Sequence, residues 1–390
     1  MNYLVVDQTT LQSGFPRGRI IPSDDVIGRQ GFLKRLEERL YYGDSVVLAG
    51  PRRTGKSSAA FEVLRGLAAR NCYTLDIDLL HVIDMEHFAL QVLKKVTQLR
   101  TGVLQHAASS MQDFLRWIAK PDLSVKVHDV EFGLRFQPDA ARVEPMTVLQ
   151  EAFEMAERIV KKDERRLIFL FDEFQEVDRL GGDGLLRMLR SVFQRQENVT
   201  YLFLGSEPSM LKTIFSDQRQ AFYRFATILH LPDIEAQEWV EYTHKKLATL
   251  GMGIEESAMQ SILTITGGHP YCMMTALTNA FFEAKNTGVE LITGQMAMDS
   301  LTQTFEQLDA IYEDMWKKVL EIQDGEVVLA AIAAGDPPYR GKSPTTVRRA
   351  IDALIKTSII VRTARGQYHF VEPMFQRWII TNIGGQISLF

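Results

Sequence analysis

The sequence predicts an α/β fold in which a parallel sheet is covered by helices on both faces. Two observations support this prediction. Strand patterns alternate with helical periods up to about residue 231, and a glycine-rich turn joins the first apolar strand, "SVVLA", to a helix. Such alternation is typical of parallel sheets, because a parallel connection needs a crossover segment. We expect helices and a C-terminal β-hairpin to follow the sheet.

The first strand is expected at residues 45–49. The helix after it has apolar residues at Ala60, Val63, Leu64 and Leu67, a helical period, and Asn71 is its expected stop. The same criteria place further strands at 72–79, from 166, from 199 and at 226–231, and further helices at 88–99, 146–161 and 184–196.

Three later segments complete the predicted domain organisation. Residues 120–142, with "LSVKVHDVEFGLRF", alternate polar and apolar side chains and are interpreted as a hairpin inserted into a core domain of residues 1–232. A helical lid is expected at 233–318, with no strand before about residue 357. In 319–390, helices at 325–334 and 344–356 precede two β-rich runs around 364–366, the pattern of a winged helix.

Composition limits the range of functions. The 390 residues are 46% hydrophobic and 24% charged with a net charge of −5, which is globular and sufficient for two or three domains. The spacing of the two cysteines, Cys72 and Cys272, suggests neither a disulfide nor a zinc site. Such cysteine usage is typical of proteins in the reducing cytosol. No signal peptide or membrane-spanning run is visible. We therefore expect a cytoplasmic protein with no membrane partner.

Residues Gly50 to Ser57 match the phosphate-loop pattern G-x-x-x-x-G-K-S/T. Glycines let backbone N–H groups face phosphates, and the following helix adds its positive N-terminal dipole. Lys56 is expected at the β- and γ-phosphates, and the Ser57 hydroxyl on Mg²⁺. We expect ATP to be bound by the loop and the start of the helix: Gly50, Pro51, Arg52, Arg53, Thr54, Gly55, Lys56, Ser57 and Ser58. Arg52 and Arg53 occupy its variable part, where exposed charges are the simpler interpretation.

An acidic pair follows a second buried strand. In "LIFLFDEF", Asp172 and Glu173 come directly after five apolar residues, at the carboxyl edge where α/β ligand sites form. Asp172 is suited to hold Mg²⁺, and Glu173 to orient and polarise the attacking water. The presence of Glu173 favours ATP hydrolysis over nucleotide binding alone, and we expect this hydrolysis to be slow.

Two more residues are candidates for the reaction. Ser206 ends the next strand, in "FLGSEPS", where a hydroxyl can sense the γ-phosphate or hold the water; a plain turn residue is the alternative. Arg224 precedes the last strand and could offset charge on the transferred phosphoryl group, in cis or on a neighbouring subunit. A surface salt bridge is the alternative for Arg224.

These motifs together resemble the archaeal-type P-loop ATPases, which are related to STAND NTPases and to AAA+ origin-recognition initiators. The resemblance rests on "VIGRQGFLKRLEERL", "GPRRTGKSS", "LIFLFDEFQEV", "FLGSEPSML", "FYRFATILHLPDI" and "TGGHPY", and spans roughly residues 26–378. It implies that Ile27, Gly28 and Arg29 bound the adenine pocket. It also implies that His269 and Pro270 belong to the element by which the lid reports on nucleotide, although His269 as a core or capping histidine remains open.

Two departures from these relatives affect the prediction. Ser206 stands where STAND proteins usually carry an arginine, and the lid helix "YCMMTALTNAFFEA" lacks the second sensor arginine of many AAA+ proteins. Arg224 is therefore the main candidate for an arginine finger.

The C-terminal segment is basic. Seven basic residues and one acid, Asp352, lie between 340 and 365. Arg348 and Arg349 would lie on the recognition helix of a winged helix and Arg365 at its wing tip, suited to duplex DNA. Two functions remain open: a DNA-associated ATPase that forms a nucleotide-dependent homo-oligomer, or a STAND-like signalling switch whose winged helix clamps the nucleotide and does not bind DNA.

Overall fold

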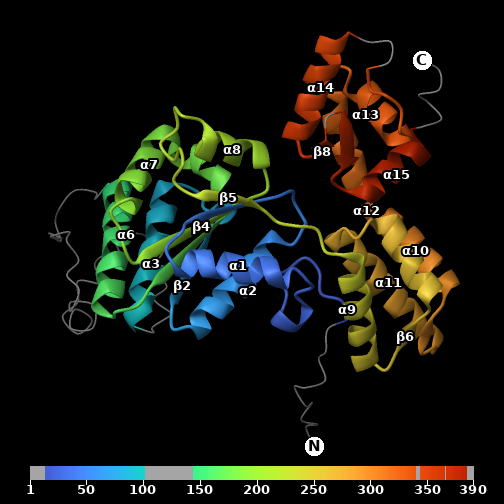
Figure 1. The fold of residues 1–390 in the computed structure, drawn as a ribbon, viewed down its shortest axis with the longest axis horizontal. Coiled ribbons are helices and arrows are strands. Elements are labelled where there is room, and N and C mark those ends of the chain that lie inside the picture. The colour runs from blue at the N-terminus through green and yellow to red at the C-terminus, as the bar shows by residue number, and fades with distance from the viewer. Residues whose placement is uncertain (1–13, 102–143, 340–342, 365, 384–390) are drawn as a thin grey trace, which may run out of the picture. The chain divides into compact units, whose positions relative to one another are not determined.

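The computed structural model describes residues 14–101, 144–339, 343–364 and 366–383 (Figure 1). The chain divides into two compact units. The sheet unit contains residues 30–50 and 59–231, and the helical unit contains residues 1–29, 51–58 and 232–390. The predicted hairpin at 120–142 lies outside the described residues, and so does Arg365.

The sheet unit is built on five strands in the order β2-β3-β4-β1-β5. All four strand pairs are parallel, as the alternation of strands and helices predicted. The strands are β1 (Val46–Ala49), β2 (Tyr73–Asp78), β3 (Leu167–Asp172), β4 (Val199–Gly205) and β5 (Thr227–His230).

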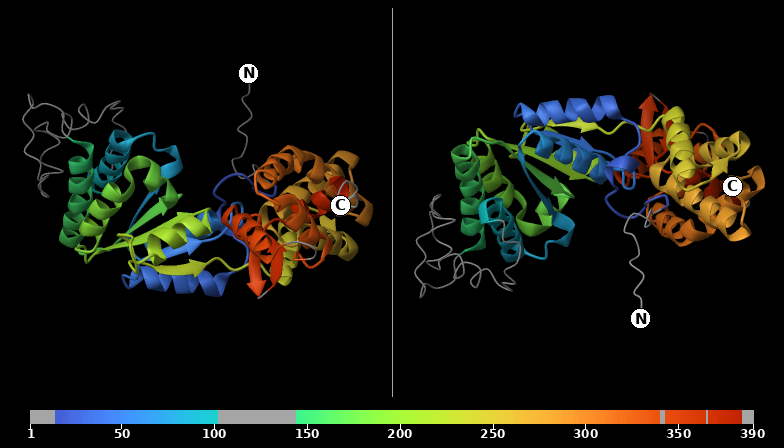
Figure 2. Two further views of the ribbon diagram at one scale, coloured as in Figure 1. Left: turned by 90° about the horizontal axis from the view of Figure 1, so that it is seen from above. Right: turned by 90° about the horizontal axis from the view of Figure 1, so that it is seen from below.

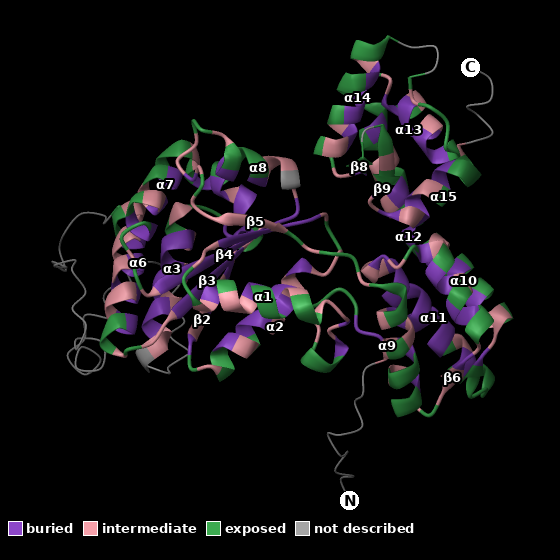
Figure 3. Ribbon diagram, in the orientation of Figure 1, coloured by how far each residue is buried: buried purple, intermediate pink, exposed green. Residues whose placement is uncertain are grey.

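Helices cover both faces of this sheet. On one face, strand residues such as Val47, Phe169 and Phe203 share a buried core with α3 (Met85–Thr101), α6 (Pro145–Lys162), α7 (Val177–Phe193) and α8 (Pro208–Ser216). Alternate residues such as Val46 and Leu202 are also fully buried but lie outside that core, because successive side chains of a strand point to opposite faces. Figures 1 and 2 show α1 (Gln30–Tyr41) and α2 (Lys56–Ala69) beside each other on that second face. Strands β1, β3 and β4 are buried almost throughout, whereas β5 is mostly half-buried (Figure 3).

Helix α7 contains a kink at its predicted start. Gly182 has φ 52° and ψ −140°, a conformation that glycine adopts at little cost, and the regular helix begins beyond it. The apolar period from residue 184 therefore predicted the straight part of α7, and the turn before the kink was missed. Short 3₁₀ turns complete the unit at Leu79–His81 and Phe174–Glu176.

The helical unit packs α9 (Ala236–Thr249), α10 (Glu256–Thr266), α11 (Pro270–Thr287) and α12 (Gly294–Leu320), with a 3₁₀ turn at Ser23–Asp25. Trp239, Met273 and Leu277 lie in its buried core. The expectation that no strand precedes residue 357 was wrong, because β6 (Gly253–Ile254) and β7 (Leu291–Ile292) form a short parallel pair. Strands of two residues are too short to show an alternating pattern.

The C-terminal part of this unit has the predicted order of elements. Helices α13 (Gly325–Ala334) and α14 (Pro344–Lys356) precede an antiparallel pair, β8 (Ile360–Ala364) and β9 (Gln367–Phe370), and an additional helix α15 (Pro373–Asn382) follows. Helix α12 runs through the expected boundary at 318, so the division into three domains stays a prediction. Within the described ranges, no helix has the length and apolar character needed to cross a membrane.

Phe153 of α6 tests how the helix layer is held on the sheet. Its ring is fully buried and lies 5.4 Å from the ring of Phe169 and 5.0 Å from that of Phe193, measured between centroids. Phe153→Ala should lower the free energy of unfolding by about 3–5 kcal/mol and the melting temperature of the sheet unit by roughly 10 °C, measured by calorimetry. Phe282→Ala, at a ring that is 52% exposed, should change the melting temperature far less. Equal shifts for the two variants would contradict this packing.

Candidate functional site

Three strands bring predicted site residues to one edge of the sheet. Ala49 of β1 pairs with Gly205 of β4, and Phe171 of β3 pairs with Phe203 of β4. Because all three strands are parallel, the residues at and just after their ends lie at the same carboxyl edge. Those residues are Gly50, where the phosphate loop begins, Asp172 and Ser206.

The carboxylate of Glu173 is held by hydrogen bonds from three groups. The Ser206 hydroxyl donates to Glu173 Oε2 at 2.8 Å, and the Ser206 backbone N–H donates to the same oxygen at 3.1 Å. Gln175 Nε2 donates to it at 2.5 Å. Asp172 Oδ1 in turn accepts from the Glu173 backbone N–H at 3.0 Å. The structure thus joins Ser206, Glu173 and Asp172 in one network, and three donors on one oxygen fix the orientation of the Glu173 carboxylate.

The backbone of this network is adapted to its side chains. Glu173 has φ 52° and ψ 48°, in the left-handed region that costs a non-glycine residue on the order of 1 kcal/mol. A Cβ at position 205 would lie 2.5 Å from Gln175 Oε1, so a glycine is needed there for Gln175 to reach Glu173. Sequence reasoning missed Gln175, although its place two residues after the acidic pair was a usable indication.

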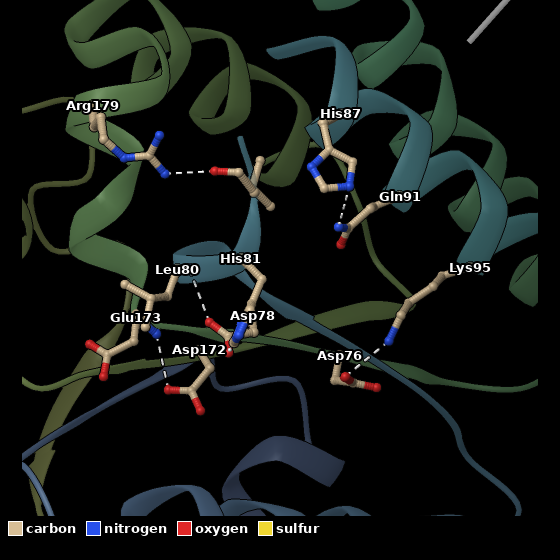
Figure 4. Close-up of polar contacts among 11 residues, drawn as sticks. Asp76, Asp78, Leu80, His81, His87, Gln91, Lys95, Asp172, Glu173 and Arg179 are labelled. Atoms are coloured by element: carbon tan, nitrogen blue, oxygen red, sulfur yellow. Dashed lines mark hydrogen bonds and ion pairs between the residues drawn. The ribbon is translucent and has the colours of Figure 1, made fainter. Parts of the chain in front are cut away.

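Asp78 adds a third carboxylate at this edge, which sequence reasoning also missed. It pairs with Asp172 in the register of β2 and β3. Its Oδ1 accepts from the Leu80 N–H at 3.0 Å and its Oδ2 contacts His81 Nδ1 at 2.7 Å (Figure 4). Asp78 therefore caps the turn after β2.

The guanidinium of Arg179 ties that turn to the start of α7. It donates to the carbonyls of Val82 at 2.7 Å and Ile83 at 3.1 Å.

The phosphate loop from Pro51 to Ser58 belongs to the helical unit and is closed by its own bonds. The Thr54 hydroxyl donates to the Pro51 carbonyl at 2.9 Å, and Lys56 Nζ donates to the same carbonyl at 2.5 Å. Gly55 has φ 91°, which a side chain would strain. Lys56 is only 6% exposed, so its ammonium needs hydrogen-bond acceptors, which the loop supplies.

Arg29 fastens the "IGR" segment to this loop. Its guanidinium donates to the Thr54 carbonyl at 3.1 Å, and its backbone N–H donates to Glu238 Oε1 at 3.0 Å. Burial lowers the pKa of Arg29 to about 10, against the opposing charges of Asp233 and Glu238, so it remains a cation at neutral pH. Ile27 is buried in the core of the helical unit. The contact of these residues with adenine stays a prediction.

Glu238 is the residue that shapes the "IGR" turn. Gly28 has φ 58°, and a Cβ there would lie 2.1 Å from Glu238 Oε2, so a side chain at this position would be strained and would displace the Glu238 carboxylate. The same carboxylate accepts from the Glu235 N–H at 3.0 Å and completes the capping box of α9. The spacing of Glu235 and Glu238 at the start of a predicted helix was the missed indication.

His269 and Pro270 begin α11. Pro270 occupies the first helical turn, and the side chain of His269 does not cap the helix although the residue stands at the N-cap. His269 is 6% exposed, and neither ring nitrogen has a hydrogen-bond partner among the described residues. Burial lowers the pKa of His269 to about 4, with further lowering by Arg53 and Arg29, so the ring is neutral at pH 7.

The two arginines in the variable part of the loop differ in their surroundings. Arg52 is exposed, as expected for a surface charge. Arg53 is exposed as well, and its guanidinium also contacts Tyr271 and Glu372.

Several features fit a magnesium nucleotide. His269 Nδ1, His269 Nε2 and Arg29 Nε are buried and have no hydrogen-bond partner among the described residues. A ligand with hydrogen-bond donors and acceptors would satisfy them. The Ser57 hydroxyl and the Asp172 carboxylate are hard oxygen donors of the kind Mg²⁺ prefers alongside phosphates. Ser57 and Ser58 lie in the first turn of α2, where backbone N–H groups attract anions.

Arg224 stands apart from these contacts. It is exposed, has φ 54°, and its guanidinium carbon lies 5.1 Å from the ring centroid of Tyr223. Its backbone N–H donates to the Phe215 carbonyl at 3.0 Å, which fixes the turn before β5. Its role as an arginine finger stays a prediction.

No protein-family model matches the chain, and no curated protein sequence matches it either. Solved structures do resemble it. The Walker-type ATPase PABY2304 of Pyrococcus abyssi has a TM-score of 0.65 and 18% identity, over 91% of this chain and 96% of that chain. The ORC2 protein of Aeropyrum pernix, in its ADPNP-ADP complexes, has a TM-score of 0.56 and 13% identity, over 96% and 97%. The ADP form of that protein gives a TM-score of 0.52. This likeness confirms the predicted fold: the chain has the fold of the Walker-type and origin-recognition P-loop ATPases.

Proposed function

We propose that the chain is a magnesium-dependent ATPase that acts as a nucleotide-dependent switch or assembly factor. The observation that carries the proposal is the edge of the sheet where the phosphate loop begins beside Asp172 and a Glu173 held by Ser206. A nucleotide-binding scaffold would need the loop alone. A glutamate fixed by three hydrogen-bond donors, at the strand edge where that loop begins, is what water activation requires.

Each residue has a distinct task in this proposal. Lys56 binds the β- and γ-phosphates, while Ser57 and Asp172 hold Mg²⁺, which supplies charge neutralisation at the phosphates when bound. Glu173 orients the attacking water and accepts its proton. Ser206 positions the Glu173 carboxylate through the hydrogen bond at 2.8 Å.

Arg224 is proposed as the residue that links hydrolysis to assembly. Its exposure allows the guanidinium to reach a neighbouring copy of the chain. A homo-oligomer formed with ATP would then complete each site with an arginine from the next subunit.

The C-terminal helices and hairpin are proposed to be a winged helix that binds duplex DNA. Arg348 and Arg349 are exposed on α14, and Arg362 is exposed on β8. Asp352 lies 3.9 Å from Arg348 and 3.8 Å from Arg362, so it offsets part of this charge. The alternative is a STAND-like switch in which the same module clamps the nucleotide and binds no DNA.

Lys56→Ala should abolish nucleotide binding. At an ATP concentration 100 times the dissociation constant, the free energy of unfolding of the wild-type chain should increase by about 2.7 kcal/mol, seen as a rise in melting temperature. The variant should show no increase. Lys245→Ala, at an exposed lysine of α9, is the matched control and should keep the full rise. A wild-type chain with no rise would refute the proposal at its first step.

Glu173→Gln should lower ATP hydrolysis by about 100-fold or more while ATP still binds, because the amide cannot accept the proton of the water. Ser206→Ala should lower the hydrolysis rate by a smaller factor, since it removes one of three hydrogen bonds to Glu173. Phosphate release measured in single-turnover reactions separates chemistry from binding. Unchanged hydrolysis in Glu173→Gln would overturn the catalytic assignment.

Arg348→Ala with Arg349→Ala should weaken duplex DNA binding and reduce the slope of log affinity against log salt by about 2. Asp352→Asn should strengthen binding, because it removes the acid between two arginines. Fluorescence anisotropy over a salt series measures both effects, and the exposed pair Arg187→Ala with Arg219→Ala is the control. No DNA binding by the wild type, with or without ATP, would favour the STAND-like alternative.

A further inference from the structure

Arg53 stands at a position of the phosphate loop where the motif accepts any residue. Its backbone has φ 63°, in the left-handed region that costs a non-glycine residue on the order of 1 kcal/mol. Phosphate binding by backbone N–H groups does not explain why an arginine occupies such a position. The contacts of its side chain offer another reason.

The guanidinium of Arg53 meets two residues from distant parts of the helical unit. Its carbon lies 4.7 Å from the ring centroid of Tyr271, in the first turn of α11. Its NH1 lies 4.0 Å from Glu372 Oε1, at the N-cap of α15. All three residues belong to the same compact unit. One side chain of the phosphate loop thus contacts both the lid and the C-terminal module.

Glu372 is an unusual partner because its carboxylate is buried. Its side chain is 8% exposed, and it makes no capping hydrogen bond to α15. Burial raises the pKa of Glu372, while the charge of Arg53 and a hydrogen bond from Tyr312 pull that pKa back down. Loss of the Arg53 charge would leave this buried carboxylate less well compensated. The position of Arg53 therefore affects the stability of the start of α15.

The start of α15 is packed too tightly to follow Arg53 if the loop moves. A Cβ on Gly267, at the end of α10, would lie 2.5 Å from Pro373 Cγ, so the Pro373 ring packs closely against the Gly267 backbone. Arg377 NH2 also donates to the Thr264 carbonyl at 3.4 Å. Glu372 is thereby held against the lid, and a displaced Arg53 would leave its carboxylate without a nearby cation.

We propose that Arg53 is a positioning residue that couples the phosphate loop to the C-terminal module through Glu372 and Tyr271. The nucleotide part of this inference rests on the proposed function; the contact between loop and module does not. Since coupling is reciprocal, whatever binds the loop changes the stability of α15, and the charge of Glu372 changes the affinity of the loop for anions.

The first test needs no nucleotide. Hydrogen exchange of the α15 amides is measured in the full chain for the wild type, Arg53→Ala, Glu372→Gln and the double variant. Arg53→Ala should lower α15 protection on the order of fivefold, and it should lower it much less when Glu372→Gln has already removed the charge. Arg53→Lys should restore only part of the protection, because lysine keeps the charge and loses the planar contact with Tyr271.

A matched pair controls for ordinary ion pairs. Lys318 and Asp314 on α12 lie 3.1 Å apart with both side chains more than half exposed. The corresponding cycle, Lys318→Ala with Asp314→Asn, should leave α15 protection unchanged. Additive effects of Arg53→Ala and Glu372→Gln would overturn the coupling.

The second test uses ATP and ADP as probes. Glu372→Gln should bind both several-fold more tightly, because the loop keeps its cation and loses an opposing carboxylate, and Arg53→Ala should bind them more weakly. Unchanged affinity in both variants, in a chain whose wild type binds ATP, would overturn the coupling to nucleotide. A wild type that binds no ATP would instead refute the proposed function, and the exchange cycle would still decide whether Arg53 and Glu372 are coupled.

Discussion

Parallel pairing of β1 and β3 with β4 is the constraint on which the candidate site depends. Because Ala49 pairs with Gly205, and Phe171 with Phe203, the chain leaves these strands at one edge and in register. A shift of one residue would turn every buried side chain of a strand to the opposite face. The aromatic core below the edge makes that shift costly: Phe171 stacks against Phe169 at 4.8 Å and Phe203 at 5.8 Å between centroids. The hydrophobic core thus fixes the position of Asp172 and Ser206.

Much of this arrangement could be predicted from the sequence, for a physical reason. Five apolar residues before Asp172, and the loop between a buried strand and a helix, are local patterns, and parallel strands bring their ends together without further information. The order of the strands, the pair β6 and β7, and the kink at Gly182 could not be predicted in this way. They depend on contacts between residues far apart in the sequence, or on elements too short to show a period.

The side chains that orient the predicted site residues were not predicted from the sequence, for the same reason. Gln175 reaches Glu173 only because position 205 is glycine, and Glu238 shapes the turn at Gly28 from 210 residues away in the chain. Their spacing gave only a local indication, because neither residue type is specific to such a role. Their function is to satisfy a carboxylate or a backbone N–H, which becomes visible only when the acceptor and the donor are placed together. Residues of a sequence motif are easier to predict than the residues that orient them.

The helical unit holds the phosphate loop by contacts that differ in strength. Arg29 is bound through its backbone to Glu238 and through its guanidinium to Thr54, with hydrogen bonds of 3.0 and 3.1 Å. Arg53 meets Glu372 only at 4.0 Å, with a side chain that is 35% exposed. A charge pair at that distance, partly open to solvent, is weaker than a hydrogen-bonded one and more sensitive to other charges nearby. Arg29 therefore fixes where the loop lies, whereas the contact of Arg53 is weak enough for an anion in the loop to change it.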